Sequence, residues 1–238
     1  MILTEDEKNE IKSVLYQHID LNCIFRCNPE QIYCEDVSVG KLPSQTPKPK
    51  EKESSVVFYL RRLTSNPKLL EYVCALFFDD IMNKIKNDEE YGSFQIAGLE
   101  TSSMPIITGM QMYALKFGLE INSFSIRKSR KDYGLGHLIN GIPNKERVLF
   151  VDDLFNSGSS LNTCLGTCFW ELELESTKNS YVIYNNNPTG DNTYFYEGDT
   201  ININSIFMKK EFDLNYSKEK YWLPQDCDRS YNKRPDYK

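Results

Sequence analysis

Hydrophobic residues of this chain fall into two kinds of segment: short unbroken runs, and longer stretches in which they recur every three or four positions. The short runs are rich in β-branched and aromatic residues, which is typical of strands buried on both faces of a parallel sheet. They cover residues 94–97, 123–127, 147–151 and 180–184. Helical spacing covers residues 105–117 and 161 to about 174. The alternation of the two patterns predicts an α/β fold with a doubly wound, mainly parallel central sheet.

The segments on either side of this core indicate that the chain has three parts. Residues 11–24 have helical spacing, whereas residues 41–55 combine prolines and charges without a hydrophobic period, as in an exposed loop. A long helix is expected after Asn66, which can cap it, with Pro67 in its first turn. We therefore expect an N-terminal hood over 1–55, a core domain over 56–211 and a C-terminal extension over 212–238.

Composition and charge narrow the classes of function. The 238 residues include 34 acidic and 28 basic side chains, a net charge of −6, so we expect no nucleic-acid partner. No apolar segment approaches the roughly 20 residues of a membrane-spanning helix, and the charged N-terminus MILTEDEKNEIK does not resemble a signal peptide. Seven cysteines, an odd number without a C-x-x-C pair, favour a reducing compartment and argue against a zinc site. The sequence thus predicts a cytoplasmic enzyme without a membrane partner.

The strongest chemical signal lies in residues 148–161, VLFVDDLFNSGSSL. Asp152 and Asp153 are expected to leave the carboxyl end of a buried strand, the edge at which ligands bind in open α/β sheets. Small residues then form a turn that ends where helical spacing begins. This turn comprises Asn156, Ser157, Gly158, Ser159 and Ser160. Backbone N–H groups at a helix N-terminus form an anion site, so carboxylates beside it suit a sugar phosphate whose hydroxyls donate to them.

Three other interpretations of the acid pair were weighed. The magnesium end of a P-loop nucleotidase requires a G-x-x-x-x-G-K-S/T loop, which the upstream sequence lacks. A phosphoacceptor receiver domain carries such acids near its start, whereas here they stand at positions 152 and 153 of 238. A solvated acidic turn does not account for the small-residue loop and the helix start that follow. We therefore favour a ligand site.

The stretch resembles the phosphoribosyl pyrophosphate (PRPP) signature of the type I phosphoribosyltransferases: a hydrophobic strand, two acids, two variable residues and a loop rich in Ser, Thr and Gly. Three more segments are similar to the orotate phosphoribosyltransferase branch, in the expected order. FYLRRLTSNPKLL (58–70) resembles its first strand and core helix, FQIAGLETSSMPIITGMQMYAL (94–115) its pyrophosphate loop and the next helix, and FSIRKSRKDYGLGHLING (124–141) its mobile catalytic loop.

The resemblance implies a glycosyltransferase of the pentosyltransferase class, which transfers phosphoribose from PRPP to a nitrogenous base in pyrimidine nucleotide biosynthesis or salvage and releases pyrophosphate. Mg²⁺ is expected to arrive bound to PRPP, without direct protein ligands. The catalytic residues expected are Asp152, Asp153, Arg127 and Lys131. The residues expected to bind PRPP are Lys128, Asn156, Ser157, Gly158, Ser159 and Ser160, and the pyrophosphate loop is expected over Glu100, Thr101, Ser102 and Ser103.

The basic segment fits this chemistry. Arg127, Lys128, Arg130 and Lys131 precede a glycine-containing loop that could close over departing pyrophosphate and exclude water. The resemblance implies a homodimer with shared active sites, in which Lys131 reaches the site of the neighbouring subunit. His137 is a further candidate phosphate ligand, although the family's loop histidine aligns with Tyr133.

Several positions depart from the orotate enzymes. Many of them carry a Lys where Ser102 stands here, and a Thr where Asn156 stands. Their Arg after the later strand falls in residues 184–187, which contain no cation, and their early Lys-Ser-Gly loop is replaced by the stretch around Lys48 and Lys50. A carboxylate without a bidentate Arg loses strong hydrogen bonds. The residues therefore support PRPP more firmly than orotate.

Two functions remain open from the sequence. The first is the transferase, with orotate as the principal named acceptor. The second is a PRPP-binding regulatory or interaction protein of the same fold without turnover. The Arg-Lys segment favours catalysis, because a binder needs no clamp for a leaving group, whereas the changes at the pyrophosphate and base positions favour the binder.

Overall fold

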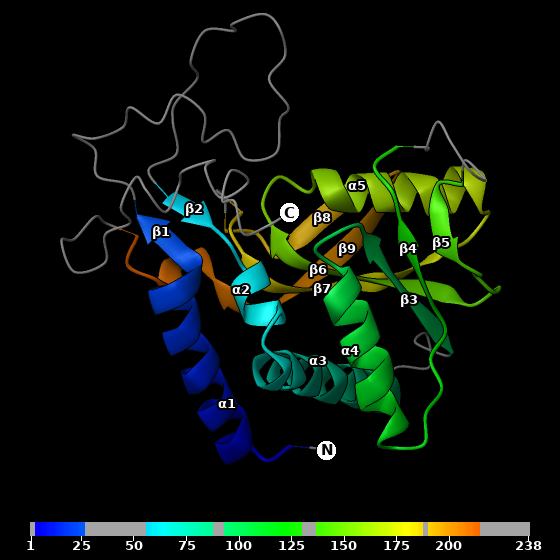
Figure 1. Ribbon diagram of the computed structural model, residues 1–238. Helices are drawn as coiled ribbons and strands as arrows, with labels where there is room; N and C mark the ends of the chain where they lie inside the picture. Colours follow the sequence, from blue (N-terminus) through cyan, green and yellow to red (C-terminus); the bar gives the residue numbers. More distant parts are fainter. Residues whose placement is uncertain (1–2, 27–55, 88–92, 130–136, 188–189, 215–238) are drawn as a thin grey trace, which may run out of the picture.

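The computed structural model describes residues 3–26, 56–87, 93–129, 137–187 and 190–214. Within them lies a seven-stranded sheet with the order β5-β4-β3-β6-β7-β9-β8 (Figure 1). The five inner strands are parallel, and β5 and β8 run antiparallel at the edges. This confirms the expected mainly parallel α/β sheet. Its strands are β3 (Phe94–Leu99), β4 (Ser123–Ile126), β5 (Ile139–Gly141), β6 (Arg147–Phe155), β7 (Ser176–Asn185), β8 (Thr193–Tyr196) and β9 (Asp199–Met208).

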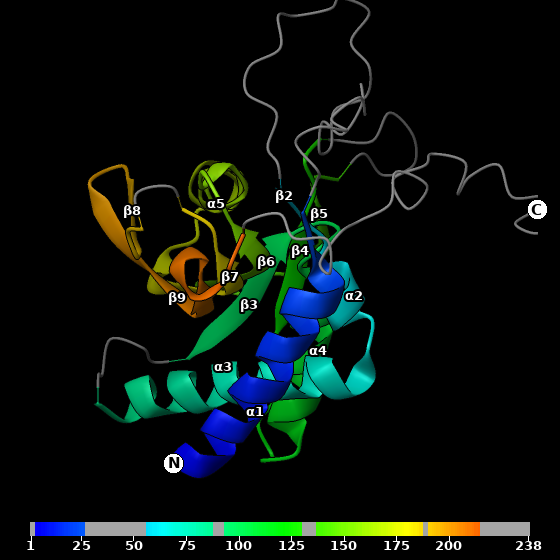
Figure 2. The ribbon, with the colours of Figure 1, turned by 90° about the vertical axis from the view of Figure 1, so that its left-hand side faces the viewer.

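Helices cover both faces of the sheet, as Figure 2 shows from the side. One face carries α1 (Glu5–His18), α3 (Pro67–Asn87) and α4 (Met104–Leu115), and the other carries α5 (Ser159–Gly166). Alternate residues of β6 enter the two cores: Leu149 packs on the side of α3 and Phe150 on the side of α5. The hydrophobic runs are unbroken because both faces of the inner strands are buried.

Strand β6 is longer than the hydrophobic run predicted. It continues through Asp152 and Asp153 to Phe155, because its backbone pairs with β7 as far as Phe155 opposite Asn185. The expectation that both acids follow the strand was therefore wrong, since Asp152 and Asp153 are themselves residues of β6, near its carboxyl end. The sequence pattern also missed β5, β8 and β9, whose polar and aromatic residues reflect their places at or near the sheet edges.

The helix boundaries also differ from the predicted ones. The helix expected over 161–174 begins at Ser159, ends at Gly166 and passes into a π-helical turn, Thr167–Glu171. The N-terminal helix begins earlier than expected, at Glu5, where the Thr4 side chain and Glu7 form a capping box. The cap at Asn66 is confirmed, because its Oδ1 accepts hydrogen bonds from the backbone N–H groups of Lys68 (3.0 Å) and Leu69 (3.2 Å).

A small second sheet lies beside the carboxyl ends of the parallel strands (Figure 1). It pairs β1 (Ile24–Arg26) with β2 (Val56–Phe58) in antiparallel fashion, and the short helix α2 (Arg61–Thr64) follows β2. Residues 41–55, the expected exposed loop, lie outside the described residues. Phe212, the first residue of the expected extension, is buried and stacks on Tyr16 of α1 with ring centroids 4.6 Å apart.

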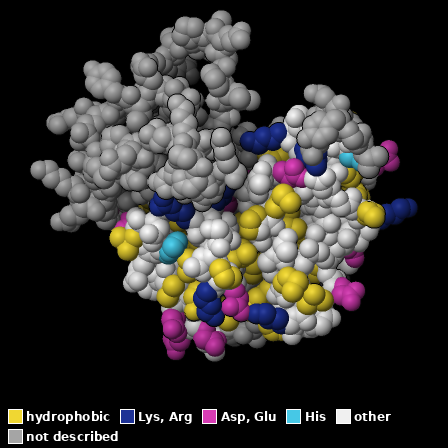
Figure 3. Space-filling view, in the orientation of Figure 1, with side chains coloured by type: hydrophobic (Ala, Val, Ile, Leu, Met, Phe, Trp, Pro, Cys, Tyr) yellow, Lys and Arg dark blue, Asp and Glu magenta, His cyan; other side chains and the backbone are white. Residues whose placement is uncertain are grey.

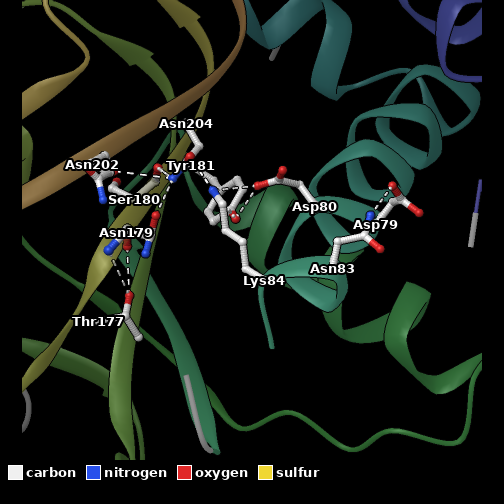
Figure 4. Close-up of polar contacts among 10 residues, drawn as sticks. All are labelled: Asp79, Asp80, Asn83, Lys84, Thr177, Asn179, Ser180, Tyr181, Asn202 and Asn204. Carbon is white, nitrogen blue, oxygen red and sulfur yellow. Dashed lines mark hydrogen bonds and ion pairs between the residues drawn. The ribbon is translucent and has the colours of Figure 1, made fainter. Parts of the chain in front are cut away.

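A polar network ties α3 to the sheet (Figure 4). Lys84 pairs with Asp80 on the same helix at 2.8 Å, and the Tyr181 hydroxyl of β7 donates to Asp80 at 2.6 Å. Lys84 also donates to the side-chain oxygen of Asn204 on β9. These contacts fix the helix against β7 and β9 where the hydrophobic core ends. None of the helices in the described part of the chain has the length and hydrophobicity needed to cross a membrane.

Candidate active site

A pocket of about 180 Å³ lies at the carboxyl ends of β3 and β6, beside the middle of β7 and the start of α5. Asp152 and Asp153 line it from β6, and the whole turn from Asn156 to Ser160 lines it from the start of α5. Ser102, in the loop after β3, closes another side. The structure therefore brings together the acid pair, the small-residue turn and one residue of the expected pyrophosphate loop.

The turn owes its shape to Gly158. This residue has φ +80° and stands at the N-cap of α5, a backbone conformation that glycine adopts without strain. Its carbonyl accepts the backbone N–H of Asn162 at 2.8 Å, which starts the helix. The first backbone N–H groups of a helix have no partner within it, so those after Gly158 are available to an anion.

The end of β3 packs closely both on β6 and on the loop that follows β3. A Cβ at Gly98 would lie 2.4 Å from the carbonyl oxygen of Val151 and 2.5 Å from Cβ of Ser103, so only glycine fits. The buried Ser103 hydroxyl donates to the carbonyl of Leu99 at 2.7 Å. Ser103 thus shapes the loop, whereas Ser102 faces the acids, donating to Oδ1 of Asp152 at 2.8 Å. The peptide bond between Glu100 and Thr101 is cis.

The two carboxyl groups perturb each other. Burial and the neighbouring charge of Asp153 raise the pKa of Asp152 to about 7, and the hydrogen bond from Ser102 acts in the opposite direction. Burial also raises the pKa of Asp153. Hydrogen bonds and the charge of Arg61 on α2 act in the opposite direction and offset only part of this rise. Partners that donate hydrogen bonds or positive charge at this place would favour the ionised pair. Hydroxyls of a sugar and a cation both meet this description.

Arg127 directly follows β4, and its side chain is held by neighbours from two other segments. Its Nε lies 3.7 Å from Oε2 of Glu100, and its Nη2 donates to Oδ1 of Asn140 at 2.9 Å. Glu100 in turn accepts hydrogen bonds from Ser125 (2.9 Å) and from Asn140. The Glu100 side chain therefore orients the guanidinium, a role that the sequence did not predict for it.

The structure says less about the other candidate residues between Lys128 and His137. Lys128 and His137 are exposed. Lys131 and Tyr133 lie outside the described residues, so the structure does not place the expected catalytic lysine.

The asparagines expected at the base position separate into two groups. Asn186 donates through Nδ2 to Oδ1 of Asn156 at 3.3 Å, which joins the end of β7 to the turn. Asn185 is buried and points away, donating to the carbonyl of Asp191 (3.2 Å) and to Oδ1 of Asn192 (3.1 Å). Asn156 and Asn186 are thus the amides next to the pocket, and Asn185 shapes the loop behind it.

Two residues near the site escaped the sequence analysis. Tyr194 of β8 packs against Gly158, and its position could be found only from the pairing of β8 with β9. Arg61 acts on Asp153 through its charge. It stands in the quoted segment FYLRRLTSNPKLL, but no local pattern indicates that α2 lies near β6. Among the described residues, no group of three or more His, Cys, Asp and Glu side chains is arranged to hold a metal ion.

The chain is similar to known proteins in both sequence and structure. No protein-family model matches the chain. Orotate phosphoribosyltransferase of Pyrococcus furiosus is 33% identical over 112 residues, which cover 46% of this chain and 56% of that protein. The enzyme of the same name from Leptospira biflexa is 25% identical over 162 residues, covering 67% and 83%. The chain spans little more than half the length of the first of these relatives.

Solved structures show the fold. A phosphoribosyltransferase from Corynebacterium diphtheriae superposes with a TM-score of 0.57 at 17% identity, covering 85% of this chain and 98% of that one. Adenine phosphoribosyltransferase from Trypanosoma brucei, solved with AMP, pyrophosphate and ribose-5-phosphate, superposes with a TM-score of 0.52 at 12% identity, covering 88% and 84%. These comparisons confirm the resemblance and the fold that the sequence predicted.

Proposed function

We propose that this chain, which has the fold of the type I phosphoribosyltransferases, is a pentosyltransferase that moves phosphoribose from PRPP to a nitrogenous base and releases pyrophosphate. Its similarity in sequence to orotate phosphoribosyltransferases supports an enzyme of the orotate type, acting in pyrimidine nucleotide metabolism. Burial of the thiols of Cys23, Cys74, Cys164 and Cys168 as free cysteines supports a reducing, cytoplasmic location.

One observation carries the proposal: a single pocket holds two adjacent carboxylates and the open N-terminus of a helix. The carboxylates accept hydrogen bonds from the ribose hydroxyls, and the backbone N–H groups after Gly158 bind the 5′-phosphate. Ser102 lines the same pocket and contacts Asp152, and we assign the pyrophosphate of a bound PRPP to its loop.

The reaction breaks the bond between C1 of the ribose and pyrophosphate, and forms a bond from C1 to a nitrogen of the base. The electron pair of the broken bond leaves with pyrophosphate, so stabilising that negative charge is the main catalytic task. We assign binding of the phosphate oxygens to Arg127, which Glu100 and Asn140 orient, and to the exposed Lys128 beside it. Lys131 adds a further cation from the same segment.

The oxygen ligands in the pocket fit Mg²⁺ that is carried by PRPP. Asp152, Asp153 and Ser102 offer hard oxygen atoms, but they are too few to hold the ion without oxygens of the substrate. Bound in this way, Mg²⁺ supplies positive charge to the leaving pyrophosphate. The protein residues orient the ribose, and the ribose hydroxyls and the positive charge that arrive with the substrate favour the ionised form of the acids.

The second part of the proposal is a homodimer with shared active sites. An apolar groove of about 840 Å³ runs between α3 and α4, and it reaches Thr101 of the pyrophosphate loop. Met104 and Met112 are 42% and 61% exposed there, and Figure 3 shows hydrophobic side chains gathered over α4. A second copy seated on this face would come close to the site, as the proposed role of Lys131 in the neighbouring subunit requires. The division into residues 1–55, 56–211 and 212–238 remains part of the proposal.

A PRPP-binding protein without turnover is the second candidate. It is favoured by Ser102, which donates to Asp152 where the resemblance places a Lys, and by the amides of Asn156 and Asn186 at the base position. The test is release of pyrophosphate from PRPP and Mg²⁺ with orotate, uracil and purine bases offered in turn. Release with any base supports the transferase, whereas PRPP binding without release supports the binder.

A further inference from the structure

The hairpin of β8 and β9 places one aromatic ring directly on the phosphate-binding turn. Tyr194 lies in the edge strand β8, opposite Ile201 of β9. A Cβ built on Gly158 would lie 2.3 Å from Cε2 and 2.8 Å from Cδ2 of this ring. The ring therefore occupies the space that any side chain at position 158 would need.

Tyr194 also contacts the segments on either side of the turn. Its hydroxyl donates to Oδ1 of Asn162, in the first turn of α5, at 3.1 Å. Its ring packs edge-on against Phe155, the last residue of β6, with centroids 6.1 Å apart and planes at 80°. One side chain thus touches the end of the strand, the glycine of the turn and the start of the helix.

This arrangement matters because the turn is intrinsically free to move. Glycine populates positive and negative φ almost equally, so Gly158 by itself does not hold the turn in one conformation. An anion site made of backbone N–H groups binds tightly only when these groups are already aligned, since ordering them on binding reduces the affinity. The ring and hydroxyl of Tyr194 restrict both ends of the turn.

We propose that Tyr194 is a positioning residue that holds the turn 156–160 in the conformation that binds the 5′-phosphate of PRPP. The inference rests on the proposed function, because it assigns this turn to a sugar phosphate. The contacts of Tyr194 are with Phe155, Gly158 and Asn162 and not with Glu100–Ser103, so pyrophosphate binding should not depend on Tyr194.

The first experiment measures ribose 5-phosphate and pyrophosphate binding by calorimetry in Tyr194→Ala and Tyr194→Phe. Tyr194→Ala should weaken ribose 5-phosphate about tenfold and leave pyrophosphate within about twofold, because only the phosphate turn loses its support. Tyr194→Phe keeps the ring on Gly158 and should retain most of the affinity. Phe195→Ala is the matched control, since Phe195 is the next residue of the same strand and is 74% exposed.

Steady-state kinetics give a second measurement of the same effect. If the wild type catalyses the transfer, Tyr194→Ala should raise KM for PRPP and leave kcat almost unchanged, because the 5′-phosphate is bound equally in the ground and transition states.

The second experiment tests the contact itself with a double-mutant cycle. Gly158→Ala places a methyl group against the ring and also strains the backbone at φ +80°. The backbone strain is the same with or without the ring, whereas the collision disappears in Tyr194→Ala. Gly158→Ala should therefore shift the urea midpoint of unfolding less in the Tyr194→Ala protein than in the wild type.

The outcomes separate this inference from the proposed function. If the wild type binds ribose 5-phosphate and Tyr194→Ala binds it equally well, the inference is wrong and the proposed function stands. Equal effects of Gly158→Ala in both backgrounds would also overturn it. If the wild type binds neither ribose 5-phosphate nor PRPP, both proposals fall.

Discussion

The hydroxyl of Ser102 donates a 2.8 Å hydrogen bond to Oδ1 of Asp152, joining the loop after β3 to the acids of β6. This bond favours the ionised carboxylate, whereas burial and Asp153 oppose it and raise the pKa of Asp152 to about 7. The charge of the proposed PRPP site should therefore change near neutral pH. Ser102 occupies the position at which the resemblance places a lysine. A lysine there would bind pyrophosphate by its charge, whereas the Ser102 hydroxyl lowers the pKa of Asp152.

The first prediction concerns this pH dependence. Asp152 accepts hydrogen bonds from ribose hydroxyls best when ionised, so PRPP affinity of the wild type should fall as the pH is lowered through about 7. Ser102→Ala removes a hydrogen bond that lowers the pKa, so the fall should begin at a higher pH. Calorimetric titration with PRPP across this range measures both curves. Asp152→Asn is the control, because its affinity should lack this titration, and a Ser102→Ala curve that coincides with the wild-type curve would refute the prediction.

The acid pair itself gives the second prediction. Asp152→Asn combined with Asp153→Asn should lower PRPP affinity at least about tenfold, or roughly 1.4 kcal/mol. Hydrogen bonds to charged acceptors contribute about 1.5 to 3 kcal/mol each, so the loss of two such acceptors exceeds this bound. The double variant should remain folded, because burial raises the pKa of both carboxyl groups and a neutral amide of similar size avoids the cost of burying a charge. Unchanged PRPP affinity in a folded double variant would refute the site assignment.

Lys131 gives the third prediction. Lys131→Ala should reduce pyrophosphate release about a hundredfold or more, and PRPP affinity by no more than about threefold, because a cation that engages the departing phosphates stabilises the transition state preferentially. The rate at saturating PRPP and the calorimetric affinity measure the two effects.

The same variant tests whether active sites are shared. A hybrid dimer of Lys131→Ala with the double Asn variant would contain one site with both acids and a lysine from the other subunit. Mixing the two inactive proteins should therefore restore activity. No restored activity, although native mass spectrometry detects hybrid dimers, would contradict shared sites.

The fourth prediction concerns the base. Asn156 and Asn186 offer neutral amides, which pair with the edge of a neutral heterocycle better than with a carboxylate. Orotate should therefore be only weakly preferred over uracil or purine bases when they compete in one reaction. Efficient turnover of orotate alone would show that a cation reaches its carboxylate. The candidates would then be Arg61 on α2 and four basic residues outside the described part of the chain: Lys48 and Lys50 before β2, and Arg229 and Arg234 in the C-terminal segment.

The acid pair and the small-residue turn of the candidate site could be found from the sequence, because both lie within one short segment of the chain. The hydrophobic run before Asp152, the small residues up to Ser160 and the helical spacing after them lie within one short segment. The strand nevertheless extended past the acids, because pairing with β7 does not depend on the hydrophobicity of each residue.

The contacts that shape the site could not be predicted in the same way. Gly98 is required by the carbonyl of Val151, and Gly158 is covered by Tyr194 from another strand. The structure shows that Glu100 and Asn140 hold Arg127, whereas its role at phosphate stays a prediction. Each of these contacts joins residues that are distant in the sequence, so each depends on the order of the strands in the sheet.

The most direct test of the account is release of pyrophosphate from PRPP and Mg²⁺ by the wild type, measured with each base in parallel with the Asp152→Asn, Asp153→Asn variant. We predict base-dependent release by the wild type, and its loss in the variant at PRPP concentrations that saturate the wild type. PRPP binding by the wild type without release for any base would contradict the transferase and leave the PRPP-binding protein. Release that the variant retains in full would contradict the assignment of the site to Asp152 and Asp153.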